Sequence, residues 1–213
     1  MPTILTFGDS NTHGTPPLTV RGVYERIGSG TRWPTVMAKD LGPDWTLVEE
    51  GLPGRTTCFP DPVMGAHMDA RPALRMALES HGPIDVLTIM LGTNDTKAMF
   101  GVTPEAICGG LASLISITEM PELQARHGGF RTLIICPPPV KIAGVLAGEF
   151  FGGDTKSRAL PALYKALADH RNCGFLNAGD HIEVSALDGV HYEPASHVTL
   201  GHAVAKAVTA LVG

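Results

Sequence analysis

The sequence lacks a long apolar run, a cluster of basic residues and a pattern of paired cysteines. Its four cysteines are widely spaced over 213 residues with no CxxC, which favours reduced thiols in a cytoplasmic protein over a disulfide framework. Lys and Arg number 16 against 21 Asp and Glu, so no surface for nucleic acid is expected. No apolar stretch approaches the ~18 residues that cross a bilayer, so no membrane association is expected.

Motifs for phosphate, metal and export are also missing. There is no GxxxxGKS phosphate loop. His197 and His202 are five residues apart on an expected helix, which is off-face for a metal pair, and no carboxylate accompanies them. We therefore expect no metal and no other cofactor. The N-terminus has no basic segment and an apolar run starts at Thr3, so we expect no signal peptide and a cytoplasmic location.

What is present is an alternation of strand and helix patterns in a chain that is 44% hydrophobic and 17% charged. Short apolar runs predict strands at 3–7, 45–48, 84–91, 131–136 and 174–177. Helical spacing and end signals predict helices at 32–41, 71–80, 103–120, 155–170 and 194–212, with Thr31 as the N-cap of the first. With no repeat or linker, residues 1–213 form one domain. The prediction is a three-layer α/β fold of the flavodoxin-like type with a five-stranded parallel sheet.

Ser10 follows the first expected strand, where Gly8-Asp9-Ser10 turns the chain. Ligands of open parallel sheets bind beyond the carboxyl ends of the strands, so this serine is placed like a nucleophile. A serine that only caps a turn is the structural alternative. Asp9 is interpreted as a structural hydrogen-bond acceptor and not as a member of a catalytic triad.

Groups that could activate such a serine follow other strands. His191 could take the proton of Ser10, and Asp188, three residues earlier, could fix its tautomer. The backbone N–H groups of Ser10 and Gly54 and the amide of Asn94 are suitable donors for a developing oxyanion. Two rivals stay open: His13 lies close to Ser10, and Gly51 competes with Gly54.

Four blocks resemble those of the SGNH (GDSL-type) hydrolases, in the family's order and over nearly the whole chain. They are Gly8–Ser10, Gly54–Thr56, Gly92–Asp95 and Asp188–His191. The resemblance implies the SGNH hydrolase fold and a Ser-His-Asp triad that works through an acyl-enzyme. It assigns Ser10 as nucleophile, His191 as base and acid, Asp188 as its orienter, and Ser10, Gly54 and Asn94 as oxyanion hole.

Three further segments, Glu49–Leu52, Met90–Lys97 and Pro137–Pro139, are similar to the bacterial arylesterase/acyltransferase branch of that family. This resemblance implies an octameric esterase for short acyl groups, acetyl esters of aryl or carbohydrate alcohols, in which acyl transfer extends hydrolysis. Members of the branch tend to carry Leu-Thr-Trp-Gly-Trp after the serine, whereas this chain has Asn11-Thr12-His13-Gly14-Thr15. A wider, more polar pocket is therefore expected, with Asn11 and His13 in contact with substrate.

The apolar segment 140–153 is expected to form a subunit interface at the mouth of the site, with folding onto its own domain as the alternative. The competing functions are a catalytically silent oligomeric scaffold and a flavodoxin-like protein that binds a small ligand, a nucleotide or phosphate. Both leave the Asp188 and His191 pattern unexplained.

Overall fold

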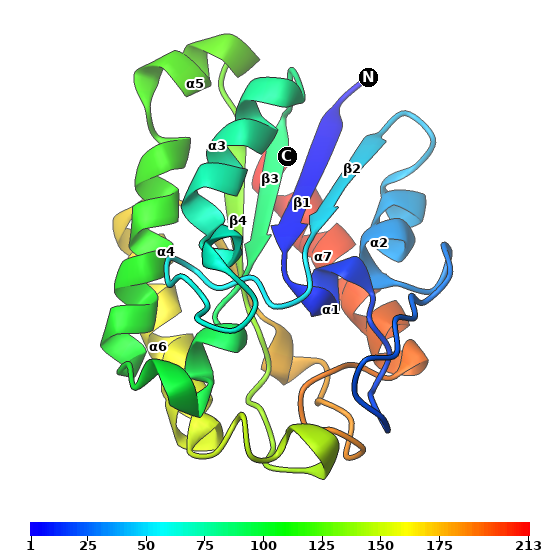
Figure 1. Ribbon diagram of the computed structural model, residues 1–213. Helices are drawn as coiled ribbons and strands as arrows, with labels where there is room; N and C mark the ends of the chain where they lie inside the picture. Colours follow the sequence, from blue (N-terminus) through cyan, green and yellow to red (C-terminus); the bar gives the residue numbers. More distant parts are fainter.

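A sheet of five parallel strands forms the middle layer of the computed structural model, which describes residues 1–213 (Figure 1). The strand order is β2-β1-β3-β4-β5, so the chain reverses its direction of winding beside β1. Such a switch point opens a crevice at the carboxyl ends of the strands. The predicted fold class is confirmed. The strands are β1 (Thr3–Gly8), β2 (Thr46–Gly51), β3 (Val86–Met90), β4 (Arg131–Cys136) and β5 (Gly174–Asn177).

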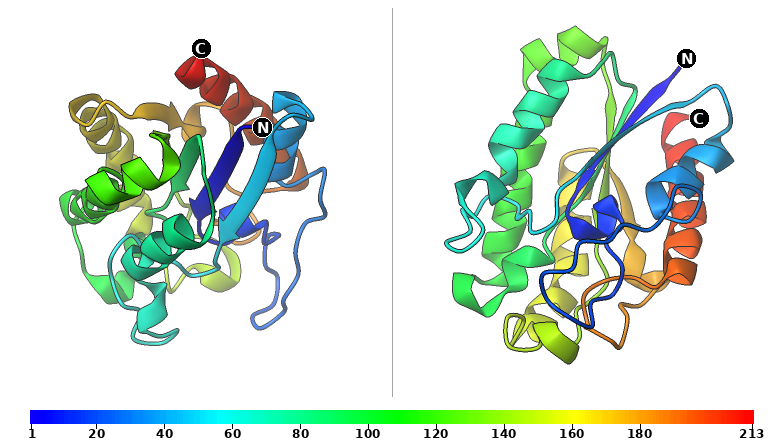
Figure 2. Two further views of the ribbon diagram at one scale, coloured as in Figure 1. Left: turned by 90° about the horizontal axis from the view of Figure 1, so that it is seen from above. Right: turned by 45° about the vertical axis from the view of Figure 1, so that its right-hand side comes forward.

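Helices cover both faces of the sheet (Figures 1 and 2). On one face lie α2 (Trp33–Leu41) and α7 (Pro194–Val212), and on the other lie α3 (Ala70–Ser80), α4 (Pro104–Thr118) and α6 (Gly153–His170). No helix combines the length and the apolar character that crossing a membrane requires. The remaining helical segments are short: α1 (Ser10–His13), α5 (Pro121–His127), η1 (Ala66–Met68), η2 (Asn94–Thr96), η3 (Ala98–Phe100), η4 (Gly144–Leu146) and η5 (Ala178–Asp180).

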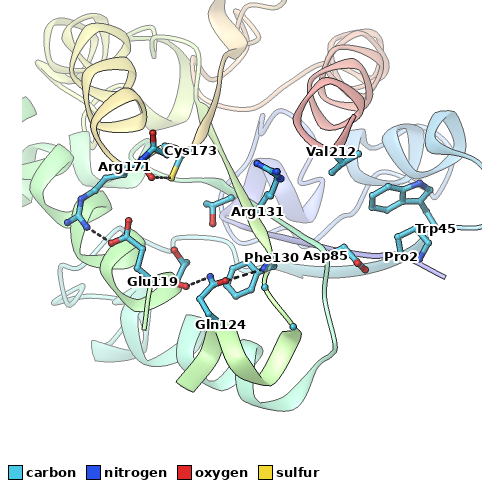
Figure 3. Close-up of a pocket in the computed structure, with 15 residues that line it drawn as sticks. Pro2, Trp45, Asp85, Glu119, Gln124, Phe130, Arg131, Arg171, Cys173 and Val212 are labelled. Atoms are coloured by element: carbon cyan, nitrogen blue, oxygen red, sulfur yellow. Dashed lines mark hydrogen bonds and ion pairs between the residues drawn. The ribbon is translucent and has the colours of Figure 1, made fainter. Parts of the chain in front are cut away.

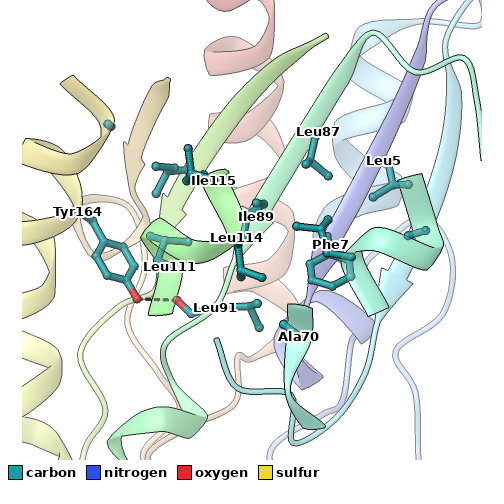
Figure 4. Close-up of a cluster of buried hydrophobic side chains, with 14 of the residues drawn as sticks. Leu5, Phe7, Ala70, Leu87, Ile89, Leu91, Leu111, Leu114, Ile115 and Tyr164 are labelled. Atoms are coloured by element: carbon teal, nitrogen blue, oxygen red, sulfur yellow. Dashed lines mark hydrogen bonds between the residues drawn. The ribbon is translucent and has the colours of Figure 1, made fainter. Parts of the chain in front are cut away.

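The strands divide the core in two because successive side chains point to opposite faces. Leu5 and Phe7 of β1 pack with Leu74, Leu111 and other side chains of α3, α4 and α6 (Figure 4). Ile4, the residue before Leu5, packs on the opposite side against α2 and α7. β1 is therefore buried on both faces, and its carboxyl end is held rigidly where the chain turns into Ser10.

The structure departs from the expected elements at four places. The expected loop from residue 11 begins with the helical turn α1, because the Asp9 side chain accepts from the Asn11 N–H at 2.9 Å and Gly14, at φ 90°, ends it. Arg32, and not Thr31, is the N-cap of α2, and it makes no side-chain cap. β2 extends to Gly51 because it pairs with β1 along its whole length. Apolar segments around Cys108, Cys136 and Cys173 predict buried thiols, but of the four free cysteines only Cys136 is buried.

The apolar segment 140–153 packs partly onto its own domain. Val140, Leu146 and Phe150 form a small cluster with Val190 of the loop before α7. Phe151 remains 75% exposed and is the apolar side chain of this segment that faces solvent most fully. The segment therefore frames the carboxyl end of the sheet whether or not a second chain covers it.

Candidate active site

Two hollows lie at opposite ends of the sheet. The larger, about 660 Å³, is an open groove at the amino ends of the strands, lined by residues that precede or begin them, among them Pro2, Trp45, Asp85 and Arg131 (Figure 3). It contains no serine or histidine, and burial raises the pKa of its one thiol, Cys173, to about 11. Ligands of parallel α/β sheets bind at the other end.

The second cavity, of about 210 Å³, lies at the carboxyl ends of the strands. Its lining includes Ser10, Gly54, Asn94 and His191. Ser10 and His191 are 181 positions apart in the sequence. These four residues come from the ends of β1, β2 and β3 and from the loop before α7. Asp188 lies behind His191 and is fully buried. The structure thus brings together all five residues predicted for the triad and the oxyanion hole.

Ser10 owes its position to the tight turn at the end of β1. Asp9 caps α1, and Ser10 is the first residue of that helical turn. Gly8 admits no side chain there, because a Cβ would lie 2.0 Å from Oγ1 of Thr12 and 2.8 Å from the carbonyl oxygen of Met90. The predicted acceptor role of Asp9 is confirmed. Burial raises the pKa of Asp9 to about 6. The hydrogen bond from the Asn11 N–H and the charges of His191 and Arg55 lower it, but by less than burial raises it.

Ser10, His191 and Asp188 form a continuous line of polar contacts. Nε2 of His191 lies 3.1 Å from Oγ of Ser10, and its Nδ1 lies 2.6 Å from Oδ2 of Asp188. The other oxygen of Asp188 accepts the backbone N–H groups of Val190 and His191, each at 2.9 Å. The Asp188 carboxylate therefore binds both the backbone of the loop that carries His191 and the imidazole of His191 itself.

The Asp188 carboxylate is stabilised in its ionised form. Burial alone would raise its pKa, but the hydrogen bond and charge of His191 and the N–H groups of Leu18 and His191 lower it to about 2. An ionised acceptor at Nδ1 leaves the proton on that nitrogen and the lone pair of Nε2 directed at Ser10. This arrangement can accept the serine proton.

Asn94 and Gly54, which carry the two remaining predicted oxyanion donors, both line the cavity. Nδ2 of Asn94 donates one hydrogen bond to the carbonyl of Arg55 at 3.1 Å and lies 3.5 Å from Oδ2 of Asp9. Gly54 has φ 90°, and a Cβ there would meet Met64 at 2.5 Å. Gly51, its rival, does not line the cavity; a Cβ there would lie 2.3 Å from the backbone N of His13. Gly51 serves the close packing of α1 on β2.

Asn11 and His13 do not line the cavity directly, and their contact with substrate stays a prediction. Asn11 is buried, and its Nδ2 donates to the carbonyl of Val190 at 3.1 Å, because α1 packs against the His191 loop. Nε2 of His13 lies 2.9 Å from the hydroxyl of Tyr24, a lining residue, and the ring makes no hydrogen bond to Ser10.

The sequence analysis missed most of the cavity wall, because these residues lie in irregular segments with no strand or helix signal. No group of three or more His, Cys, Asp or Glu residues is arranged to hold a metal ion. Leu146, Glu149 and Phe150 lie in the segment 140–153 expected at the mouth of the site, and the lining residues that were missed are Thr15, Leu18, Val23, Tyr24, Glu25, Pro53, Met64, Lys97 and Val190.

This combination of fold and site is that of a family of acyl hydrolases. A sequence profile of the GDSL-like Lipase/Acylhydrolase family matches residues 6–199. The chain belongs to this family and is a carboxylic ester hydrolase. No curated protein matches the sequence.

Solved structures with high similarity cover both chains almost completely. A carbohydrate acetylesterase from Sinorhizobium meliloti superposes with a TM-score of 0.94 at 38% identity, over 99% of this chain and 100% of that one. An aryl esterase from M. smegmatis gives 0.93 at 35% identity with the same coverage. A second carbohydrate acetylesterase family member from Sinorhizobium meliloti gives 0.91 at 32% identity over 100% of both chains.

Proposed function

We propose that this ester hydrolase is a serine esterase for short-chain acyl esters, above all acetyl esters of carbohydrate or aryl alcohols. The observation that carries the proposal is the line of contacts from Oγ of Ser10 through His191 to the buried Asp188, which opens into a cavity of about 210 Å³. The names of the similar structures, which are carbohydrate acetylesterases and an aryl esterase, support the choice of ester.

The proposed mechanism has two halves. Oγ of Ser10 attacks the ester carbonyl while Nε2 of His191 takes its proton, and the oxygen of the tetrahedral intermediate lies against the N–H groups of Ser10 and Gly54 and the amide of Asn94. Collapse breaks the bond to the alcohol oxygen, which receives the proton from His191. Water, deprotonated by His191, then attacks the acyl-enzyme and releases the carboxylic acid and Ser10.

Transfer of the acyl group to an alcohol is proposed as a second outcome of the same intermediate. The wall of the cavity includes Leu18, Leu146, Phe150 and Val190, which favour an alcohol over water at the acyl-enzyme. The acceptor would replace water in the second half-reaction and receive the acyl group on its own oxygen. Formation of an ester when a primary alcohol is added during hydrolysis tests this, with released acid as the competing product.

We also propose that this face of the molecule joins copies of the chain into an oligomer, an octamer by the family resemblance. Large apolar side chains are exposed around the cavity mouth, among them Val23, Tyr24, Met64 and Phe151. A single chain gains nothing from leaving these in water. Light scattering of the purified protein tests the proposal, with Phe151→Asp expected to lower the mass and a monomeric wild type contradicting it.

The decisive experiment compares p-nitrophenyl acetate with p-nitrophenyl octanoate for wild type and Ser10→Ala. We expect fast cleavage of the acetate and a loss of at least about 10³-fold in kcat in the variant. Ser80→Ala is the matched control, since Ser80 lies on the exposed end of α3 and bonds only within that helix. Activity in Ser10→Ala above about a tenth of wild type would contradict the triad. Faster octanoate cleavage would contradict the short-acyl preference.

A further inference from the structure

Lys97 is a buried cation in the wall of the catalytic cavity, and no step of the proposed mechanism uses it. Its side chain is 6% exposed, and it lines the cavity together with Ser10, Asn94 and His191. Its Nζ lies 3.5 Å from Oδ2 of Asp61 and 4.0 Å from Sδ of Met64, which is itself a lining residue.

These two contacts leave the ammonium group short of acceptors. It carries three N–H donors, and a good hydrogen bond to oxygen spans ~2.7–3.2 Å. The contact with Asp61 is longer than this, and the contact with a thioether is weak. A buried ammonium is costly unless its hydrogens find acceptors. The cavity is where the missing acceptors can come from.

Asp61, for its part, has a role that does not depend on Lys97. Its Oδ1 accepts the backbone N–H groups of Val63 and Met64, each at 2.8 Å, and so shapes the loop that carries Met64 over Gly54. The carboxylate would stay satisfied on that side without the lysine. Oδ2 of the buried Asp61 has Lys97 as its partner, so Asp61 both shapes this loop and holds the ammonium at the cavity wall.

The position of Lys97 places it beside the proposed oxyanion hole. Asn94–Thr96 is a 3-10 turn, and the N–H of Lys97 donates to the carbonyl of Asn94 at 3.2 Å. Side chains three residues apart on such a turn lie on the same side. The ammonium therefore stands on the same wall as the Asn94 amide, near the position of an ester bound at Ser10.

We propose that Lys97 is a specificity-determining residue that selects esters whose alcohol part carries a neutral hydroxyl beside the ester oxygen. The inference rests on the proposed esterase function and deepens it. An anionic alcohol part is disfavoured, because Glu25 and Glu149 line the same cavity. A partly acetylated polyol or sugar offers hydroxyl oxygens to the ammonium and apolar ring faces to Leu18 and Phe150.

The test uses two substrates that differ by one hydroxyl: cyclohexyl acetate and the monoacetate of trans-cyclohexane-1,2-diol, both followed by the release of acid. The measured quantity is the ratio of kcat/KM for the hydroxylated ester to that for the plain ester. In wild type we expect a ratio of about ten or more, the effect of one hydrogen bond to a charged group. In Lys97→Met we expect it to fall to about one.

Two variants separate this role from a structural one. Asp61→Asn removes the carboxylate charge but keeps the ammonium in the cavity, so the ratio should be retained. Lys165→Met is the matched control, because Lys165 pairs with Asp169 on the exposed face of α6 and does not line the cavity. If Lys97 only holds Asp61 in place, Lys97→Met and Asp61→Asn will slow both substrates alike and leave the ratio unchanged.

The wild-type protein alone also decides the question. A wild-type ratio below about three overturns the inference, even if Lys97→Met fails to fold. Failure of wild type to cleave either acetate, or p-nitrophenyl acetate, would instead contradict the proposed function itself. Cleavage of both with no hydroxyl preference contradicts the role of Lys97 only.

Discussion

The backbone N–H of Leu18 donates a hydrogen bond of 2.7 Å to Oδ2 of Asp188, the same oxygen that lies 2.6 Å from Nδ1 of His191. Leu18 belongs to the long segment between α1 and α2, which lies at the carboxyl end of the sheet beside the His191 loop (Figure 2). Its side chain lines the cavity. One residue of this segment thus contributes both to the wall of the site and to the polar contacts behind His191.

Leu18→Pro tests this connection, because proline has no N–H to donate. We expect kcat to fall about tenfold, the usual worth of a hydrogen bond to a charged group. Leu18→Ala is the control, since it keeps the N–H and shortens only the cavity wall. Steady-state kinetics on p-nitrophenyl acetate measures both, and equal losses in the two variants would show that the side chain alone matters.

Asn94→Ala removes the side-chain donor of the proposed oxyanion hole. We expect kcat to fall by about 10²–10³-fold with little change in KM, because the amide acts on the charge that develops in the transition state. Asn94→Asp is the size-matched companion and should lose at least as much, since it places a negative charge where an oxyanion forms. A rise in KM at constant kcat would assign Asn94 to substrate binding instead.

Gly54→Ala tests whether glycine is needed at residue 54, whose backbone N–H is a donor of the proposed oxyanion hole. Gly54 and Gly30 have nearly the same φ, 90° and 92°. A Cβ at Gly54 would lie 2.5 Å from Met64, whereas nothing lies within 4 Å of a Cβ at Gly30. Both alanine variants should lose about 1–2 kcal/mol of unfolding free energy through backbone strain. Only Gly54→Ala should also lose activity, as measured by urea unfolding and by esterase assay.

His197 gives a prediction about stability and pH. It is fully buried on α7, accepts the Trp33 N–H on Nδ1 at 3.3 Å, and has a pKa lowered to about 4 by burial and by the charges of His191 and Arg32. Because its ordinary pKa lies near ~6.5, the unfolded chain binds the extra proton between about pH 6.5 and 4, and stability falls as pH falls through that range.

His197→Asn keeps an acceptor for Trp33 but cannot take up the proton. Wild type should therefore lose about 3 kcal/mol more unfolding free energy than the variant between about pH 7 and pH 4. Urea unfolding at both pH values measures the difference. A difference between the two proteins that stays constant with pH would show that His197 is not kept neutral by burial.

Much of the architecture follows from local patterns. Two predicted strands and one predicted helix, 131–136, 174–177 and 194–212, coincide with β4, β5 and α7. Continuous apolar runs predict the strands, and helical spacing between a Pro and a Gly predicts the helix. α1 escaped prediction because it is one helical turn, held by the Asp9 cap and the left-handed Gly14, with no periodic signal to detect.

The chemistry-bearing residues were found from sequence for a different reason. Ser10, Asn94 and His191 each follow a predicted strand, and parallel strands place their carboxyl ends at one edge. For Asn11 and His13, sequence order says only that they lie near Ser10. Whether a neighbour faces the cavity depends on the direction of one helical turn, which packs Asn11 on the His191 loop and sends His13 toward Tyr24.

The sequence by itself determined the order of the strands along the chain, the two-sided burial of β1 and the residue types that can carry ester hydrolysis. These depend on local periodicity and on side-chain chemistry. Only the tertiary structure decided the donor from Leu18 to Asp188, the ammonium of Lys97 in the cavity wall and the size of that cavity. Such contacts join irregular segments far apart in the chain, and their geometry follows from packing that no local pattern records.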